Sequence, residues 1–111
     1  MTAKPKVYFT KEITSEILIE IYNKLEIKLQ GNIAVKVHSG EKGNKNFLKP
    51  EFMKPLVEYL NATIVETNTS GPEKMSERTT NERHKKILEE HGWTKTFKKV
   101  KYWIRKSLMK N

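Results

Sequence analysis

The chain has 111 residues, of which 36% are hydrophobic and 32% charged, and its formal net charge at pH 7 is +9. This length suits one domain with a modest core, because a chain of this size buries roughly 65% of the surface that it exposes when unfolded. The sequence contains no cysteine, which excludes disulfides, thiolate zinc sites, cysteine-ligated iron–sulfur clusters and cysteine nucleophiles within this polypeptide.

The basic charge is concentrated near the carboxyl end. Residues 93–111 carry seven lysines and arginines and no acid, whereas residues 1–92 have a net charge of only +2. We therefore divide the chain into a partial α/β domain, 1–92, and a basic tail, 93–111. No segment is apolar and long enough for a signal peptide or for a membrane span of about 20 residues, so we expect a cytoplasmic protein.

The first part of the chain predicts two strands separated by a helix. Residues 6–9, KVYF, are short and β-prone and predict a first strand. Next, apolar residues recur at helical spacing, with Thr14 placed to cap the helix. These residues are Ile17, Leu18, Ile21, Tyr22 and Leu25. The apolar run IAVKV, 33–37, then predicts a strand that is covered on both faces.

Two further helices and a third strand follow. Pro55 lacks the amide hydrogen of a regular helical residue, so we expect the second helix either to begin near Pro55 or to bend there. Residues 62–67, ATIVET, predict the third strand. Thr79 and Glu82 form a capping box for a third helix, which ends at Gly92.

The basic tail has apolar residues on one face of a predicted helix. They are Trp93, Phe97, Val100, Ile104 and Leu108. This spacing predicts a basic amphipathic helix over 93–111. Its apolar stripe covers the sheet or a missing part of the fold, or else the helix contacts an anionic membrane surface or nucleic acid.

The order β-α-β-α-β-α predicts an α/β fold with a three-stranded parallel sheet and a carboxyl-terminal basic helix. Strands that are separated by helices cannot pair as hairpins, so they run parallel with right-handed crossovers. The carboxyl ends of the strands then lie along one edge, and ligands bind at that edge of open α/β sheets.

Three segments are expected to meet at this edge: the loop 38–44, the turn 67–69 and the start of the third helix. Glycines in the loop let the backbone approach a ligand, and the amino end of a helix presents free N–H groups. With several lysines nearby, a small anion such as a carboxylate or phosphate is the expected ligand. The candidate ligand-binding residues are Lys36, His38, Ser39, Glu41, Lys42, Asn44, Thr67, Asn68 and His84.

Other interpretations of the same residues stay open. The sequence contains neither nucleotide-binding glycine motif, and the loop 38–44 can equally be a flexible turn. His38, Glu41 and His84 are weak candidates for metal ligands, since they lack a tight spacing motif. An enzyme would use His38 or Lys36 as its acid or base with Glu41 as partner, although the catalytic residues and the reaction are unknown.

Several segments taken together resemble a known family. In chain order they are KVHSGEKGN at 36–44, FLKPEFMKPLVEYL at 47–60, ATIVETNT at 62–69 and ERHKKILEEHGW at 82–93. Over residues 4–93 the chain is similar to the amino-terminal part of DUF362, a family of domains of unknown function. The residues that the resemblance carries over are Lys36, His38, Glu41, Asn44, Thr67, Asn68 and His84.

The resemblance implies an iron–sulfur-associated protein, with or without a redox role, because many longer members carry a ferredoxin-like pair of four-iron four-sulfur clusters. This chain has no cysteine for such a cluster, so no cofactor is evident, and a lysine-rich end replaces the further strands expected after Trp93. We therefore expect a truncated module. Its partners would be a small anion, a separately encoded remainder of the fold, a second copy of the chain, or nucleic acid or a membrane at the tail.

Overall fold

The computed structural model describes residues 4–103 and contains a three-stranded parallel sheet. The strands β1 (Ala34–Lys36), β2 (Thr63–Thr67) and β3 (Val100–Trp103) lie in the order β1-β2-β3, so that β2 is central. Both pairs are parallel, and Ile64 of β2 lies opposite Val35 on one side and Val100 on the other. The predicted α/β class and parallel sheet are confirmed.

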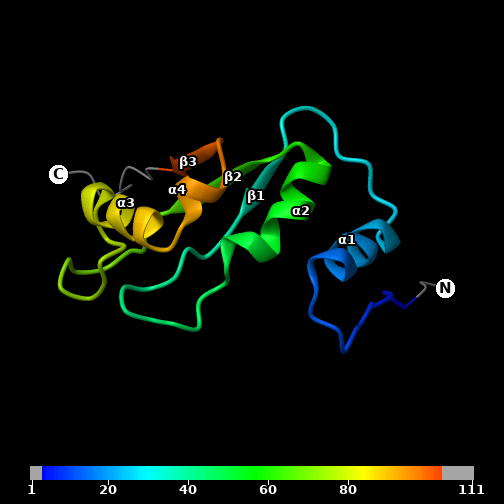
Figure 1. The fold of residues 1–111 in the computed structure, drawn as a ribbon, viewed down its shortest axis with the longest axis horizontal. Helices are drawn as coiled ribbons and strands as arrows, with labels where there is room; N and C mark the ends of the chain where they lie inside the picture. Colours follow the sequence, from blue (N-terminus) through cyan, green and yellow to red (C-terminus); the bar gives the residue numbers. More distant parts are fainter. Residues whose placement is uncertain (1–3, 104–111) are drawn as a thin grey trace.

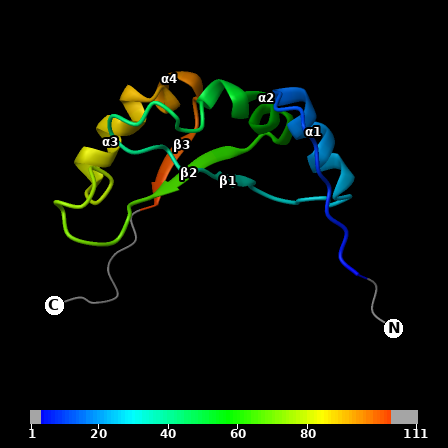
Figure 2. The same cartoon turned by 90° about the horizontal axis from the view of Figure 1, so that it is seen from below.

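Within residues 4–103, four helices accompany the sheet, and they lie on one side of it (Figures 1 and 2). They are α1 (Ser15–Lys24), α2 (Pro50–Leu60), α3 (Asn81–Glu90) and α4 (Trp93–Thr96). α2 contacts α4, α4 contacts α3, and α1 packs against α2. Between residues 4 and 103, no helix has the length and apolar character needed to cross a membrane.

Local sequence signals explain how these helices begin. The side chain of Thr14 accepts a hydrogen bond from the backbone of Ile17 and caps α1, as predicted. α2 begins at Pro50 and accommodates Pro55 in its interior. The cap of α3 is Thr80, which accepts from the backbone of Arg83, so the prediction of Thr79 as the cap is wrong by one residue.

The core lies between the sheet and the helices. Its buried members are Val37, Val57, Ala62, Ile64, Leu88, Trp93 and Phe97. Trp93 is fully buried, and its indole N–H donates to the backbone oxygen of Ser39 at 3.1 Å. The carboxyl-terminal segment therefore contributes directly to the core that positions the loop after β1.

The prediction of a first strand at residues 6–9 is wrong. Residues 6–9 form no strand, and Val7 and Phe9 are exposed. β-propensity reports how well side chains fit a half-buried pleated surface and does not supply a pairing partner. The prediction that residues 33–37 are covered on both faces is also wrong, since Ala34 and Lys36 are exposed.

The prediction of one basic helix over 93–111 is wrong for residues 97–103. α4 ends at Thr96, and Val100–Trp103 pairs with β2 as the third strand. Helical spacing of a few apolar residues cannot distinguish a helix from a short buried strand, and here pairing with β2 decides the structure. The rest of that predicted helix, 104–111, lies outside the described residues.

The burial of Trp93 gives a test of the core. We expect Trp93→Ala to lower the free energy of unfolding by about 3–5 kcal/mol, because it removes a large buried side chain and leaves a cavity. Urea denaturation followed by circular dichroism measures the change. In the control Phe9→Ala, which removes an aromatic ring that is 83% exposed, the change should stay within about 0.5 kcal/mol. Equal losses in both variants would contradict this account of the core.

Candidate functional site

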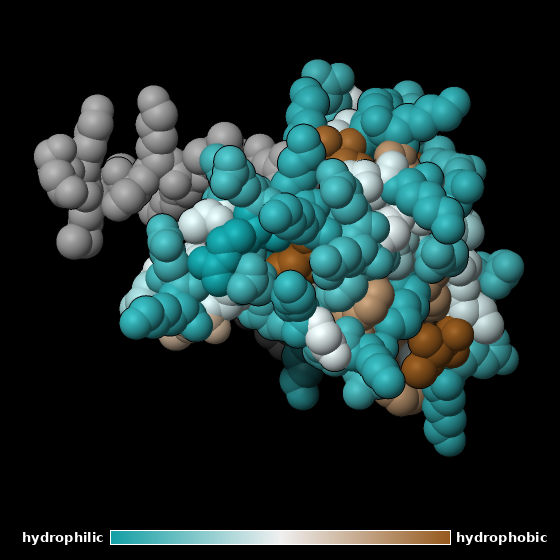
Figure 3. All heavy atoms as spheres, turned by 60° about the vertical axis from the view of Figure 1, so that its left-hand side comes forward, coloured by the Kyte–Doolittle hydropathy of each residue, from teal (hydrophilic) through white to brown (hydrophobic). Residues whose placement is uncertain are grey.

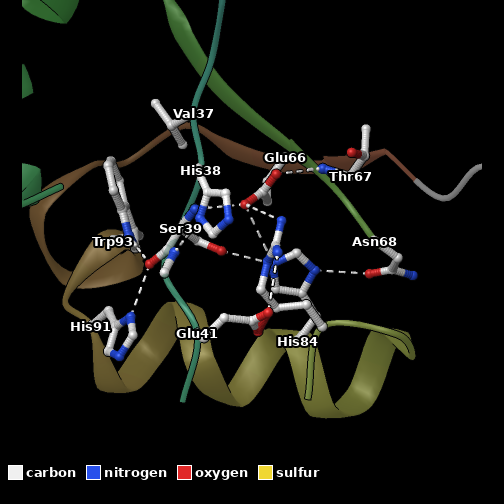
Figure 4. Close-up of polar contacts among 12 residues, drawn as sticks. Val37, His38, Ser39, Glu41, Glu66, Thr67, Asn68, His84, His91 and Trp93 are labelled. Atoms are coloured by element: carbon white, nitrogen blue, oxygen red, sulfur yellow. Dashed lines mark hydrogen bonds and ion pairs between the residues drawn. The ribbon is translucent and has the colours of Figure 1, made fainter. Parts of the chain in front are cut away.

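The carboxyl ends of β1 and β2 meet the first turns of α3 in a polar cluster. In Figure 4, Ser39, Glu66, Asn68 and His84 point toward one another above α3. Ser39 follows β1, Asn68 follows β2, and His84 lies in the first turns of α3. The predicted convergence of these three segments is therefore present in the structure.

A buried carboxylate, that of Glu66, lies at the centre of the cluster. Its Oε2 accepts the backbone N–H of Ser39 at 2.7 Å. Its Oε1 accepts one hydrogen bond from Nζ of Lys36, at 2.8 Å, and another from the backbone N–H of Thr67, at 2.9 Å. Because Glu66 is fully buried, these bonds replace the water that an ionised carboxylate would otherwise require.

Charged and ionisable groups complete the surroundings of Glu66. Nη2 of Arg78 lies 3.7 Å from Oε2, and Nε2 of His84 lies 3.6 Å from the same oxygen. Burial alone raises the pKa of Glu66, but the neighbouring His84 and the donors of Lys36 and Ser39 outweigh it and hold the pKa well below its usual value. Glu66 is therefore ionised at neutral pH.

A chain of hydrogen bonds links Ser39, His84 and Asn68. Nε2 of His84 lies 2.8 Å from Oγ of Ser39, and its Nδ1 lies 2.9 Å from Oδ1 of Asn68. A hydroxyl, an imidazole and an orienting group in this order resemble a nucleophile with its base. Ser39 and His84 are both fully buried, so a substrate cannot reach the hydroxyl in this conformation. The chain instead holds the loop, β2 and α3 together.

A second carboxylate, that of Glu41, lies at the outer edge of the cluster. Both of its oxygens accept from Oγ of Ser76, at 2.6 and 2.9 Å. Nη1 of Arg78 lies 3.5 Å from Oε2 of Glu41, so the guanidinium bridges this outer carboxylate and the buried Glu66.

The remaining predicted site residues are exposed to different degrees. His38 is exposed, and its Nδ1 accepts the backbone N–H of Gly40 at 3.0 Å. Lys42 and Asn44 are exposed in the loop. Oδ1 of Asn44 accepts the backbone N–H of Asn46 at 2.8 Å.

The loop requires glycine at residue 40. Gly40 has a φ of +97°, and a Cβ there would lie 2.5 Å from Cβ of Phe47 and 2.8 Å from Nδ1 of His91. The ring of His91 stacks on Phe47 with centroids 3.8 Å apart, and its Nδ1 lies 2.8 Å from the backbone oxygen of Ser39. This packing fixes the path of the chain from Ser39 into the loop.

Sequence reasoning missed three residues of the cluster: Glu66, Ser76 and Arg78. Glu66 stands inside the apolar strand ATIVET, where a carboxylate needs partners if it is buried. That conflict was the available signal for Glu66. No comparable signal marked Ser76 and Arg78, which lie in a long polar loop.

The described residues contain no group of three or more histidine and acidic side chains arranged to hold a metal ion. A hollow of about 880 Å³ lies between α1, residues 26–30 and α2, and none of the predicted site residues lines it. A smaller cavity of about 300 Å³ adjoins the cluster at Glu41 and Ser76. Figure 3 shows that the face on the α3 side is mostly hydrophilic, which favours a polar ligand.

Comparison with models of protein families matches residues 33–107 to the family described as "Domain of unknown function (DUF362)". The match spans the three strands, α2 to α4 and the whole polar cluster, and it begins after α1. It confirms the resemblance found in the sequence, although the matched segment begins and ends later than residues 4–93. No curated protein and no solved structure matches the chain.

The buried position of Glu66 gives a test of stability. Glu66→Gln keeps the shape of the side chain but removes its charge, which leaves Lys36 and Arg78 without their buried partner. We expect a loss of about 3–5 kcal/mol at pH 7, measured by urea denaturation. The control Glu58→Gln breaks a surface pair with Lys54 that is 3.7 Å long, and it should cost less than about 1 kcal/mol. A comparable loss in both variants would contradict the central role of Glu66.

The difference in unfolding free energy between wild type and Glu66→Gln should depend on pH. Because the pKa of Glu66 is lowered in the folded state, the unfolded chain takes up this proton at a higher pH than the folded chain. The stability that the charge supplies is present above about pH 4.3, and it is lost as the pH falls toward the folded-state pKa. We therefore expect the stability gap between wild type and Glu66→Gln to narrow from pH 5 downward. A difference in unfolding free energy that stays constant as the pH falls would contradict the lowered pKa of Glu66.

Proposed function

The chain belongs to the DUF362 family, and from this premise we propose that it is a small-anion-binding domain with its site at the carboxyl ends of β1 and β2. The observation that carries the proposal is that Lys36 and Arg78 lie beside one buried carboxylate at this edge of the sheet, where the exposed His38 follows two residues after Lys36. Ligands of open parallel sheets bind at this edge, which supports the proposed location.

Two hydrogen-bond donors support anion binding at the exposed rim. The ammonium group of Lys36 has three N–H donors, of which two bond to the backbone oxygen of Val37 at 2.7 Å and to Glu66 at 2.8 Å. Its side chain is 51% exposed, so the third donor is left for a ligand. A neutral His38 ring whose Nδ1 accepts from Gly40 carries its proton on Nε2 and offers a second donor.

An enzyme is less well supported by the same geometry. Nζ of Lys36 already donates to Glu66 and to the backbone oxygen of Val37, so it is engaged as a donor and is not placed to accept a proton from a substrate. Ser39 and His84 have the order of a nucleophile and its base but are closed to substrate. We therefore propose binding, with positioning of the ligand, as the function of this domain.

Thermal unfolding in the presence of simple anions tests the proposal. Inorganic phosphate or malonate should raise the melting temperature above that in sodium chloride of equal ionic strength, because a ligand that binds only the folded state stabilises it. Lys36→Gln and His38→Ala should each reduce this increase, since the first removes a positive charge from the rim and the second removes the ring donor.

Lys28→Gln is the matched control for Lys36→Gln, because it also removes one exposed lysine charge, outside the cluster. The quantity to compare is the anion-induced increase, since Lys36→Gln also weakens the fold. An equal increase in all variants, or no increase in wild type, would contradict the proposed site.

A further inference from the structure

The guanidinium group of Arg78 has hydrogen-bonding capacity that the described structure leaves unfilled. Arg78 is only 8% exposed, and its Nε is buried without a hydrogen-bond partner within residues 4–103. Its contacts with Glu41 and Glu66, at 3.5 and 3.7 Å, are longer than the 2.7–2.9 Å of a charge-assisted hydrogen bond. Buried cations are normally paired and hydrogen-bonded, so this arrangement is incomplete.

The two carboxylates beside Arg78 differ in how firmly they are held. Glu66 is fully buried and accepts three hydrogen bonds within 2.9 Å. The side chain of Glu41 is 44% exposed, and apart from the long contact with Arg78 its described partner is the hydroxyl of Ser76. Glu66 is therefore a fixed part of the fold, whereas water or a ligand can reach Glu41.

The contacts of Glu41 are those that an external oxyanion would make. Its two oxygens share the hydroxyl of Ser76, and its Oε2 lies 3.5 Å from Nη1 of Arg78. We propose that Ser76 and Arg78 form an oxyanion-binding subsite, and that the carboxylate of Glu41 occupies it when no ligand is bound. This inference rests on the small-anion site proposed above, for which it names the anchor and an internal competitor.

The surroundings of this subsite suit a carboxylate or a phosphate group. The adjoining cavity of about 300 Å³ is lined by Glu41, Lys42, Lys74, Met75, Ser76, Glu77 and Arg83. Arg83 is already bound in a two-pronged pair to Glu77, at 2.7 and 2.8 Å, which leaves Lys42 and Lys74 as the free exposed cations of its lining. A planar guanidinium matches both oxyanions in geometry, and lysines add attraction without fixing direction.

Displacement of Glu41 sets the affinity of the subsite. A ligand must compete with a carboxylate that is tethered to the same loop, so its apparent affinity falls with the fraction of molecules in which Glu41 is in place. If Glu41 occupies the subsite in about nine molecules of ten, its removal raises the affinity about tenfold.

Calorimetric titration of the full-length chain with inorganic phosphate, at constant ionic strength, tests the inference. We expect Glu41→Ala to bind phosphate about tenfold more tightly than wild type. Glu58→Ala removes the same charge from a distant exposed position on α2, and it should leave the affinity near that of wild type. Titration with malonate in parallel shows whether the subsite prefers phosphate or carboxylate.

A second substitution in the Glu41→Ala background locates the binding. Arg78→Lys keeps the charge but loses the fork of donors, so it should abolish most of the gain in affinity. Because Arg78 also faces Glu66, urea denaturation must show that this variant is folded; if it is not, Ser76→Ala, which removes only a hydroxyl, replaces it. A gain that persists in the folded double variant, or an equal gain in Glu58→Ala, would overturn the inference.

The outcomes separate this inference from the proposed function. If phosphate binds wild type and Glu41→Ala with equal affinity, the inference fails and the small-anion site stands. If phosphate binds neither protein, both fail. If Glu41→Ala binds phosphate tightly whether or not Lys36→Gln is added to it, the subsite at Arg78 stands, and the proposed role of Lys36 as a rim donor fails.

Discussion

The rest of the structure depends on the burial of one negative charge, that of Glu66. A carboxylate removed from water costs several kcal/mol unless hydrogen bonds and opposite charges replace its hydration. Here the replacements come from β1 through Lys36, from the following loop through Ser39, and from α3 through His84. Because each partner belongs to a different segment, satisfying this single charge fixes the segments relative to one another.

The same constraint divides the cluster into an inner and an outer part. The inner groups, Glu66, Ser39 and His84, are fully buried and are hydrogen-bonded to one another or to neighbouring segments of the fold. The outer groups, among them His38 and Glu41, are exposed or partly exposed and make fewer bonds. A rigid interior that positions an exposed rim is the arrangement that a binding site needs, and it is the basis of the proposed function.

Much of the fold could be predicted from periodicity, and part of the site could be predicted from chain direction. The apolar runs at β1 and β2 and the helix between them implied parallel strands, which brought the loop after β1 to His84. Strand β3 could not be predicted. Its sequence VKYW, 100–103, is too short for its own pattern to distinguish it from a helix, and only its pairing with β2 defines it. Arg78 was missed for a similar reason: its burial follows from contacts with Glu41 and Glu66, which tertiary structure creates.

The most direct measurement of the central claim is the titration of the Glu66 side-chain carboxyl carbon by nuclear magnetic resonance, over the acidic range in which the chain stays folded. A glutamate in an unfolded chain takes up a proton at about pH 4.3. On our account, Glu66 keeps the chemical shift of an ionised carboxylate well below that pH. A Glu66 that takes up a proton at about pH 4.3, or at a higher pH, would contradict the account.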